Sequence, residues 1–374
     1  MSLTKNEARV LEIIKEDPFI SQLKLASRLD LTRSTVASVI SSLTQKHYLL
    51  GRAYMVNESN QIICIGGMNI DRKFVLDGPL VAKTSNPASC HVSVGGVGRN
   101  VAENLGRLQV NVSMLSMAGD DQDYQIIKEA SQPYVDMNLV HLDPNYRTGT
   151  YNAVLDNTGE MQVAMADMEV CDHLTLDWLH QYQALIQGAK HLILDLNPPK
   201  ETISQVIEWA QARDIPLHIV PVSSPKMTHL PDDLQGVHWM IVNQDESEAY
   251  FNRQVESKED LIDLAQAWID RGVRQVAITR GKEATYYLSH TGEEAWLEPP
   301  HLDHIQDVTG AGDAYAAGII YGSIQDLPEI ESIRLGMANA YHTIQSDQTV
   351  RPNLSPSRIM DESQSLFSSN HSNH

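Results

Sequence analysis

Apolar residues recur at two different spacings along the 374-residue chain, and the change of spacing divides it in two. Over residues 1–57 the spacing is that of short amphipathic helices. From Gln61 onward, short apolar runs alternate with amphipathic stretches, which is typical of an α/β sheet flanked by helices. We therefore predict a small helical domain over residues 1–57 (the head), a linker at 58–60, and a larger α/β domain over residues 61–365 (the body).

The head is predicted to contain three helices and a strand. Thr4 and Glu7 have the spacing of a capping box, and Asp17-Pro18 ends the helix that follows. Thr32 is the predicted N-cap of the third helix. The expected inward-facing positions are Val10, Leu11, Ile14, Leu23, Leu25, Ala26, Leu29, Val36, Val39, Ile40 and Leu43. Because residues 52–56 alternate like a wing strand, the head resembles a winged helix-turn-helix.

The third helix has a polar face that points away from its apolar stripe. It is formed by Arg33, Ser34, Thr35 and Ser38, the residues that would enter a DNA major groove. We expect this face to bind operator DNA. One such module makes few phosphate contacts, so we expect the protein to bind as a homodimer that presents two of them. A docking or dimerisation module with a solvated polar face is the alternative.

The body shows the alternation in detail. Strands are predicted at residues 62–65, 112–117, 192–194, 217–220, 239–242 and 276–279. Helices are predicted at residues 101–108, 121–131, 176–188, 202–213, 258–271 and 311–323. Residues 73–94 and 146–166 each suggest a strand pair without a helix, so we expect them to form a small separate sheet, a lid. The Ser- and Asn-rich end, from Ser363 and most clearly at 366–374, is expected to be disordered.

Charge and cysteine content indicate which part of the chain can contact nucleic acid and in which compartment the protein works. The formal net charge of −20 is split into +3 for residues 1–57 and −23 for the remainder, so only the head is suited to contact nucleic acid. No apolar run approaches the ~18 residues of a membrane span. Cys64, Cys90 and Cys171 are odd in number and scattered, which favours free thiols in the reducing cytoplasm.

The strongest chemical motif is DVTGAGD at residues 307–313, directly before an apolar helix. The glycines leave the N–H groups of Gly310, Ala311 and Gly312 open to a phosphate at a helix N-terminus. Asp313 is placed to take a proton from a hydroxyl while these groups stabilise the transferring phosphoryl group. An aspartate in the first helical turn is also a common capping choice, which is the alternative reading.

A second glycine-rich motif, GGVGRN at residues 95–100, leads into a helix. Close backbone approach at Gly95 and Gly96 fits a polyol ligand, with Asn100 bonding a hydroxyl. From the residues alone, a tight turn that caps the helix explains the motif equally well.

The two motifs together resemble the two signatures of the ribokinase-like (PfkB) carbohydrate kinases. They stand in the right order, about 210 residues apart, and NQDE at 243–246 and TRG at 279–281 resemble further family motifs. The resemblance covers residues 61 to about 365. It implies a ribokinase-like three-layer sandwich with a β lid, and ATP-dependent phosphorylation with Mg²⁺.

The resemblance also implies roles for particular residues. Asp313 is the implied base, and the implied acceptor ligands are Asn69, Asp71, Gly95, Gly96 and Asn100. Implied ATP contacts are Asn243, Thr279, Gly281 and Asn339, with Glu246 acting on Mg²⁺ through water. Asp307, together with Thr309, is where a monovalent cation would bind. Residues 341–347 depart from the small-residue loop that accompanies potassium activation, which counts against a K⁺ requirement.

Within the family, residues 85–87, 95–100 and 155–161 look like those of pseudouridine kinases and related nucleoside kinases. This resemblance implies the 5′-hydroxyl of pseudouridine as acceptor, and it places Asp167 near the base edge. Two rivals stay open: a kinase for another nucleoside or a sugar, and a ligand-responsive transcription regulator that uses the kinase fold as its sensor.

Overall fold

The computed structural model describes residues 3–16, 20–49, 61–302 and 305–368. The chain forms two compact units. The first consists of Met1–Gln61 with Leu179–Lys190, and the second of Ile62–Trp178 with His191–His374. The predicted wing strand at residues 52–56 and the linker at 58–60 lie outside the described residues. No described helix is long and apolar enough to cross a membrane.

In the head, the described residues form α1 (Lys5–Glu16), α2 (Gln22–Leu29) and α3 (Arg33–Gln45). The predicted capping box is confirmed, because the Thr4 N–H donates to Glu7 Oε2 (2.6 Å) and the Glu7 N–H donates to Thr4 Oγ1 (3.3 Å). The predicted cap of α3 is confirmed as well, since Thr32 Oγ1 accepts from the Thr35 N–H. Side-chain oxygens thus satisfy free N–H groups at both helix starts.

The three helices bury a common apolar core. It contains most of the predicted inward positions, together with Ile20 and Leu49. The prediction for Leu23 was wrong: this side chain is 66% exposed. Leu25, Ala26 and Leu29 define the inward side of α2, and Leu23 precedes Leu25 by two residues, about 200° around the helix.

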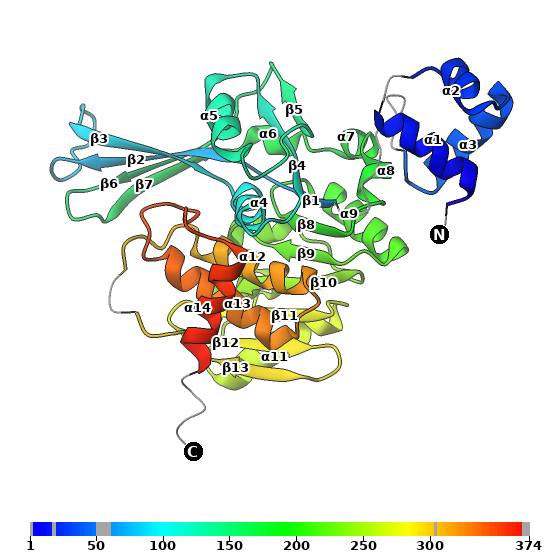
Figure 1. The fold of residues 1–374 in the computed structure, drawn as a ribbon. Helices are drawn as coiled ribbons and strands as arrows, with labels where there is room; N and C mark the ends of the chain where they lie inside the picture. The colour runs from blue at the N-terminus through cyan, green and yellow to red at the C-terminus, as the bar shows by residue number, and fades with distance from the viewer. Residues whose placement is uncertain (1–2, 17–19, 50–60, 303–304, 369–374) are drawn as a thin grey trace. The chain divides into compact units, whose positions relative to one another are not determined.

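The main sheet has nine strands within the described ranges, and Figure 1 shows helices on both of its faces. Its order is β13-β12-β11-β10-β9-β8-β1-β4-β5, parallel from β11 to β5 and antiparallel at β12 and β13. The strands are β1 (Ile62–Ile65), β4 (Val112–Gly119), β5 (Val140–Asp143), β8 (His191–Asp195), β9 (Leu217–Val220), β10 (Val237–Asn243), β11 (Gln275–Arg280), β12 (Glu283–Ser289) and β13 (Glu294–Leu297). The six predicted strands are confirmed; β5, β12 and β13 were missed.

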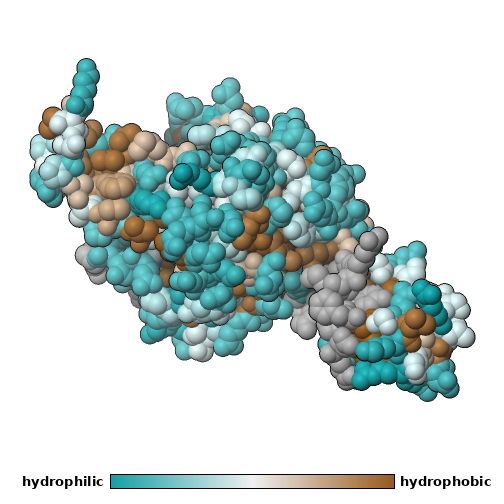
Figure 2. Space-filling model, turned by 90° about the horizontal axis from the view of Figure 1, so that it is seen from above, coloured by the Kyte–Doolittle hydropathy of each residue, from teal (hydrophilic) through white to brown (hydrophobic). Residues whose placement is uncertain are grey.

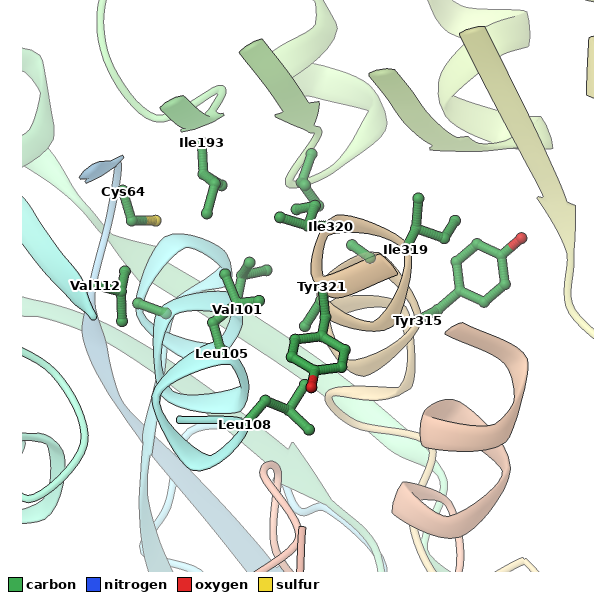
Figure 3. Packing of buried hydrophobic residues seen from close by; sticks show 14 of the residues in the cluster. Cys64, Val101, Leu105, Leu108, Val112, Ile193, Tyr315, Ile319, Ile320 and Tyr321 are labelled. Carbon is green, nitrogen blue, oxygen red and sulfur yellow. The ribbon is translucent and has the colours of Figure 1, made fainter. Parts of the chain in front are cut away.

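The remaining helices include three that carry site residues and pack together: α4 (Val97–Arg107), α12 (Ala311–Ile324) and α13 (Glu329–Thr343). Figure 3 shows Val101 and Leu105 of α4 pointing toward Ile320 and Tyr321 of α12. The others are α5 (Gln122–Ser131), α6 (Glu169–Asp172), α7 (Leu176–His180), α8 (Gln183–Ile186), α9 (Lys200–Arg213), the 3₁₀ helix η1 (Ser224–His229), α10 (Gln244–Phe251), α11 (Lys258–Asp270) and α14 (Pro356–Ser368). The single helix predicted at 176–188 is therefore two short ones.

The predicted lid is a four-stranded sheet of order β3-β2-β6-β7, which projects from one end of the main sheet (Figure 1). Its strands are β2 (Asn69–Leu76), β3 (Ala88–Gly95), β6 (Gly149–Leu155) and β7 (Met161–Asp167). Alternate residues of β2 share a face, so Asn69, Asp71 and Lys73 lie on one side of the lid.

The prediction of disorder from Ser363, including the start of the 366–374 tail, is corrected at residues 363–368, which belong to α14. Two contacts explain why a Ser-rich segment is helical here. Ile359 is fully buried, and Glu362 forms a bidentate ion pair with the buried Arg351 (2.9 and 2.6 Å). Burial and a charge-assisted pair outweigh the weak helix propensity of serine. Residues 369–374 lie outside the description.

Candidate active site

The carboxyl ends of the parallel strands gather the predicted site residues along one edge of the main sheet. Gly66 follows β1, Asp195 ends β8, and Asn243 on β10 is paired in register with Thr279 on β11. Ligands of open α/β sheets bind in the crevice outside this edge.

The acceptor side is formed where the first lid strand leaves the main sheet. Asn69 Nδ2 donates to Asp71 Oδ1 (2.5 Å), and Asn69 is paired in register with Gly95. A Cβ at Gly95 would collide with the Asp71 carboxylate. Gly96 has φ +98°, and a Cβ there would lie 2.6 Å from Met68 Cα. Both glycines are thus required for residues 95–96 to lie so close to Met68 and Asp71. Burial raises the pKa of Asp71 despite the hydrogen bond from Asn69.

Sequence reasoning missed Asp195, whose carboxylate binds the backbone next to both of these segments. Its Oδ2 accepts from the Gly67 N–H (2.8 Å) and the Gly98 N–H (3.1 Å), and Asn197 donates to both carboxylate oxygens. Asp195 is 1% exposed, so it is a positioning residue rather than a ligand. Its place directly after an apolar strand was the available signal.

Asn100 joins the acceptor side to the expected base. Its Nδ2 donates to Asp313 Oδ2 (2.7 Å), and its Oδ1 accepts from the Arg99 guanidinium (2.8 Å). Arg99 is buried and also pairs with Glu103. The Arg99 contact therefore fixes which way the Asn100 amide points, and Asn100 presents its NH₂ group to the carboxylate of Asp313.

Burial raises the pKa of Asp313 to about 6; Asp195 and Asp71 add to the shift, and Asn100 and Arg99 oppose it. A general base acts as its carboxylate, so its protonated fraction is inactive. We predict that kcat/KM falls about tenfold per pH unit below pH 6 and is level just above it. A pH–rate profile at saturating ATP tests this, and a level profile down to pH 5 would contradict it.

The expected phosphate cradle is open, with one change from the prediction. Gly310 has φ +79° and caps α12. The Ala311 N–H already donates to Val308 O (3.2 Å), whereas in the described structure the N–H groups of Gly310 and Gly312 have no such acceptor. A Cβ added at Gly312 would meet no atom within 4 Å. Gly310 and Gly312 thus offer free donors at a helix N-terminus, which suits an incoming phosphate.

The carboxylate of Asp307, the predicted cation ligand, is already paired with a lysine side chain. Lys73 of the lid donates to Asp307 Oδ2 (2.7 Å) and to Thr309 Oγ1 (3.0 Å). The pKa of Asp307 lies below its ordinary value: burial opposes the shift, and hydrogen bonds from Lys73 and Thr309 outweigh it. Sequence analysis missed Lys73; its alternate spacing from Asn69 and Asp71 was the available signal.

The nucleotide side keeps three of its four predicted residues together. The Asn243 side chain caps α10 by accepting from the Glu246 N–H, and Glu246 Oε2 accepts from the Asn243 N–H (3.0 Å). Thr279 is the in-register partner of Asn243, and Gly281, with φ +63°, makes the turn into β12. Burial raises the pKa of Glu246.

Asn339, the fourth, is not available to a nucleotide. It is fully buried; its Nδ2 donates to Asn104 Oδ1 and Ala314 O, and its Oδ1 accepts from Arg351 Nε, all at 2.9 Å. We correct its expected role: the side chain fastens α13 to α4 and α12.

Asp167 does not lie with the other predicted acceptor residues. It is exposed at the end of the edge strand β7, and it pairs in register with Thr150, itself paired with Ile70. Cross-strand partners share a face, so Asp167 lies on the face opposite Asp71. Its predicted contact with the base edge has no support in the geometry.

In the head, Arg33, Ser34 and Ser38 are exposed, and Thr35 is half-buried. The predicted polar face of α3 is therefore accessible.

Comparison with known proteins agrees with this geometry. Residues 59–356 match the pfkB family carbohydrate kinases, and residues 3–49 match a winged helix-turn-helix DNA-binding family. Pseudouridine kinase of Escherichia coli (strain K12) is 30% identical over 306 residues, covering 82% of this chain and 97% of that protein. The uncharacterized sugar kinase YeiI of the same organism is 27% identical, covering 94% of this chain and 97% of its own length. The solved structure of Arabidopsis thaliana ribokinase complexed with ribose and ATP superimposes with a TM-score of 0.69 at 17% identity, over 81% of this chain and 98% of that one.

The fold and the site thus define a sugar or nucleoside kinase with a lid. The chain belongs to the pfkB family of carbohydrate kinases, and its N-terminal helices form a helix-turn-helix domain. Kinases of this family use ATP, usually with Mg²⁺.

Proposed function

We propose that the protein transfers the γ-phosphoryl group of ATP to the 5′-hydroxyl of a nucleoside, and that pseudouridine is the preferred acceptor. The observation that carries the chemistry is the hydrogen bond from Asn100 to Asp313, because it joins the acceptor motif to the base. The choice of acceptor rests on the resemblance to pseudouridine kinase.

Each group has a defined task in this proposal. The Asp71 carboxylate accepts hydrogen bonds from the sugar hydroxyls, and the Asn69 amide donates to or accepts from them, beside the backbone of Gly95 and Gly96. The acceptor oxygen attacks the γ-phosphorus, the bond to the ADP oxygen breaks, and the hydroxyl proton goes to the Asp313 carboxylate. Gly310 and Gly312 N–H groups stabilise charge on the transferred phosphoryl group, so that positioning and electrostatics supply most of the acceleration.

The residues present fit Mg²⁺ held jointly with nucleotide. No group of three or more His, Cys, Asp or Glu side chains in the described part of the chain is arranged to hold a metal ion. Mg²⁺ commonly binds through one or two carboxylates, waters and substrate phosphates, and Glu246 at the carboxyl edge would serve through water. When bound, Mg²⁺ would neutralise phosphate charge. Asn243, Thr279 and Gly281 would contact the nucleotide.

A substrate panel tests the proposal. ADP release with Mg²⁺ and ATP is measured for pseudouridine, uridine, cytidine, guanosine, inosine, ribose and fructose. We expect the highest kcat/KM for pseudouridine. A higher value for another nucleoside or a sugar would assign the kinase to that acceptor, and this is the main alternative. Since the reaction consumes ATP, the proposal includes a cytoplasmic location.

We also propose that the head reads operator DNA and that the kinase substrate is its effector. Support comes from the family match over residues 3–49 and from the net charge of +3 in residues 1–57. The acidic remainder, at −23, disfavours DNA contact by the body. In this view sensing and catalysis coexist, because a sensor alone does not require Asp313.

The DNA proposal predicts that Arg33→Ala weakens specific binding of the full chain to its upstream DNA by about 1–3 kcal/mol, which is about 5- to 150-fold in affinity. Affinity should also fall steeply as salt is raised. Arg9→Ala, a change at an exposed position of α1, is the matched control. Equal, sequence-blind binding by wild type and Arg33→Ala in mobility shifts would make the head a docking module.

Homodimerisation belongs to the same proposal, because a palindromic operator needs two heads. The lid offers an apolar surface for it: Val92, Met161, Val163 and Met165 are 42–55% exposed, and Figure 2 shows hydrophobic residues gathered on the lid at the left. Sedimentation equilibrium of the full chain gives the oligomeric state.

A further inference from the structure

One contact ties the lid directly to the loop that precedes the phosphate cradle. Lys73 Nζ lies 2.7 Å from Asp307 Oδ2 and 3.0 Å from Thr309 Oγ1, across 234 and 236 positions of sequence. Both charged side chains are about one-third exposed. The Thr309 hydroxyl and N–H donate to the other carboxylate oxygen (2.6 and 2.8 Å), so the ammonium completes a closed set of hydrogen bonds.

The two ends of this contact belong to the two halves of the proposed reaction. Lys73 follows Asn69 and Asp71 on the same face of β2, and those two residues are proposed to hold the acceptor. Asp307 and Thr309 lead directly into Gly310, the N-cap of α12. A shift of β2 is thus transmitted through Lys73 to the loop beside the phosphoryl position.

Charge adds a second effect. Asp307 lies three residues before the free N–H of Gly310, where a highly anionic γ-phosphate has to approach. An unpaired carboxylate would repel that phosphate. The ammonium of Lys73 compensates the charge without entering the cradle.

We propose that Lys73 is a positioning residue for phosphoryl transfer: acting through Asp307 and Thr309, it couples the acceptor-binding strand of the lid to the loop that shapes the phosphate cradle. Its ammonium supplies there the single positive charge that the Asp307–Thr309 pair requires. This inference rests on the kinase activity but not on the identity of the acceptor.

Removing the ammonium leaves a carboxylate and a hydroxyl facing a space the size of a small monovalent cation. We expect Lys73→Ala to lower kcat by about 10²-fold, with a smaller change in ATP KM, since misplacement of reacting groups by about 1 Å has that effect. Ammonium chloride or potassium chloride should restore much of the activity at constant ionic strength. The activity of the wild type should change only a few-fold between sodium and potassium, because the ammonium group of Lys73 already pairs with the Asp307 carboxylate.

Lys128→Ala is the matched control, since it removes an exposed lysine from α5 and should leave both activity and cation response unchanged. The assay uses the best acceptor of the panel. A second readout needs no turnover: crystals of Lys73→Ala soaked in a thallium(I) salt should show an anomalous peak beside Asp307, and wild-type crystals should not.

Two results would overturn the proposal: a kcat of Lys73→Ala within twofold of wild type without added cation, or a loss that no monovalent cation restores in a folded variant that binds no thallium. If no acceptor in the panel is turned over, the proposed function fails, whereas the thallium peak still decides the role of Lys73.

Discussion

Asp313→Asn should lower kcat by about 10²–10⁴-fold, the usual effect of removing a general base. The amide retains the shape of the carboxylate and a hydrogen-bonding partner for Asn100, but it cannot take the hydroxyl proton. ATP affinity, measured by calorimetry without acceptor, should stay within a few-fold of wild type. Turnover within a factor of two of wild type would exclude Asp313 as the base.

The same substitution should raise the thermal stability of the protein at pH 7. Because the folded-state pKa of Asp313, about 6, lies above the ordinary value of 3.8, protonation favours the folded state. That stabilisation is complete below about pH 4 and is lost as the pH rises through about 6. A neutral Asn avoids the loss. Thermal unfolding at pH 7 therefore separates a catalytic defect from misfolding: the inactive variant should have the higher Tm.

Gly312→Ala should abolish most activity while leaving the fold intact. The added methyl group meets no protein atom within 4 Å, and Gly312 has no positive φ that an L-residue would avoid. The same space is where the phosphoryl group would approach the free N–H. We expect kcat/KM to fall by about 10²–10³-fold, comparable to the loss of one oxyanion-hole donor.

Gly78→Ala is the matched control, because it too adds a methyl group in open space, on the lid, at a position without positive φ. Both variants should unfold at the wild-type temperature. Full activity of Gly312→Ala would show that the phosphate does not use this face of α12.

The features predicted correctly depend on residues that are neighbours in sequence. A glycine-rich start followed by an apolar helix is a local pattern, and it predicted the start of α12, where Gly312 and Asp313 lie. Local alternation likewise predicted the lid strands, and the helical spacing of apolar residues predicted the polar face of α3. The resemblance to the family then related the two motifs to each other.

The features missed or misassigned depend on long-range contacts. Asp195 holds Gly67 from 128 positions away, and Lys73 reaches Asp307 from 234. Asn339 was assigned to the nucleotide, but its partners Asn104 and Arg351 lie on other elements and saturate its amide. The face on which Asp167 lies follows from the register of β7 against β6, which cannot be obtained from one strand's pattern.

The most direct test of the central claim is the product formed from pseudouridine, ATP and Mg²⁺. In proton-coupled ³¹P NMR a 5′-phosphomonoester couples to two H5′ protons and gives a triplet, whereas a 2′- or 3′-phosphate gives a doublet. We predict a triplet that grows with wild type and is absent with Asp313→Asn. A doublet, or no new phosphomonoester from pseudouridine or any other nucleoside under conditions in which ATP binds, would contradict the account.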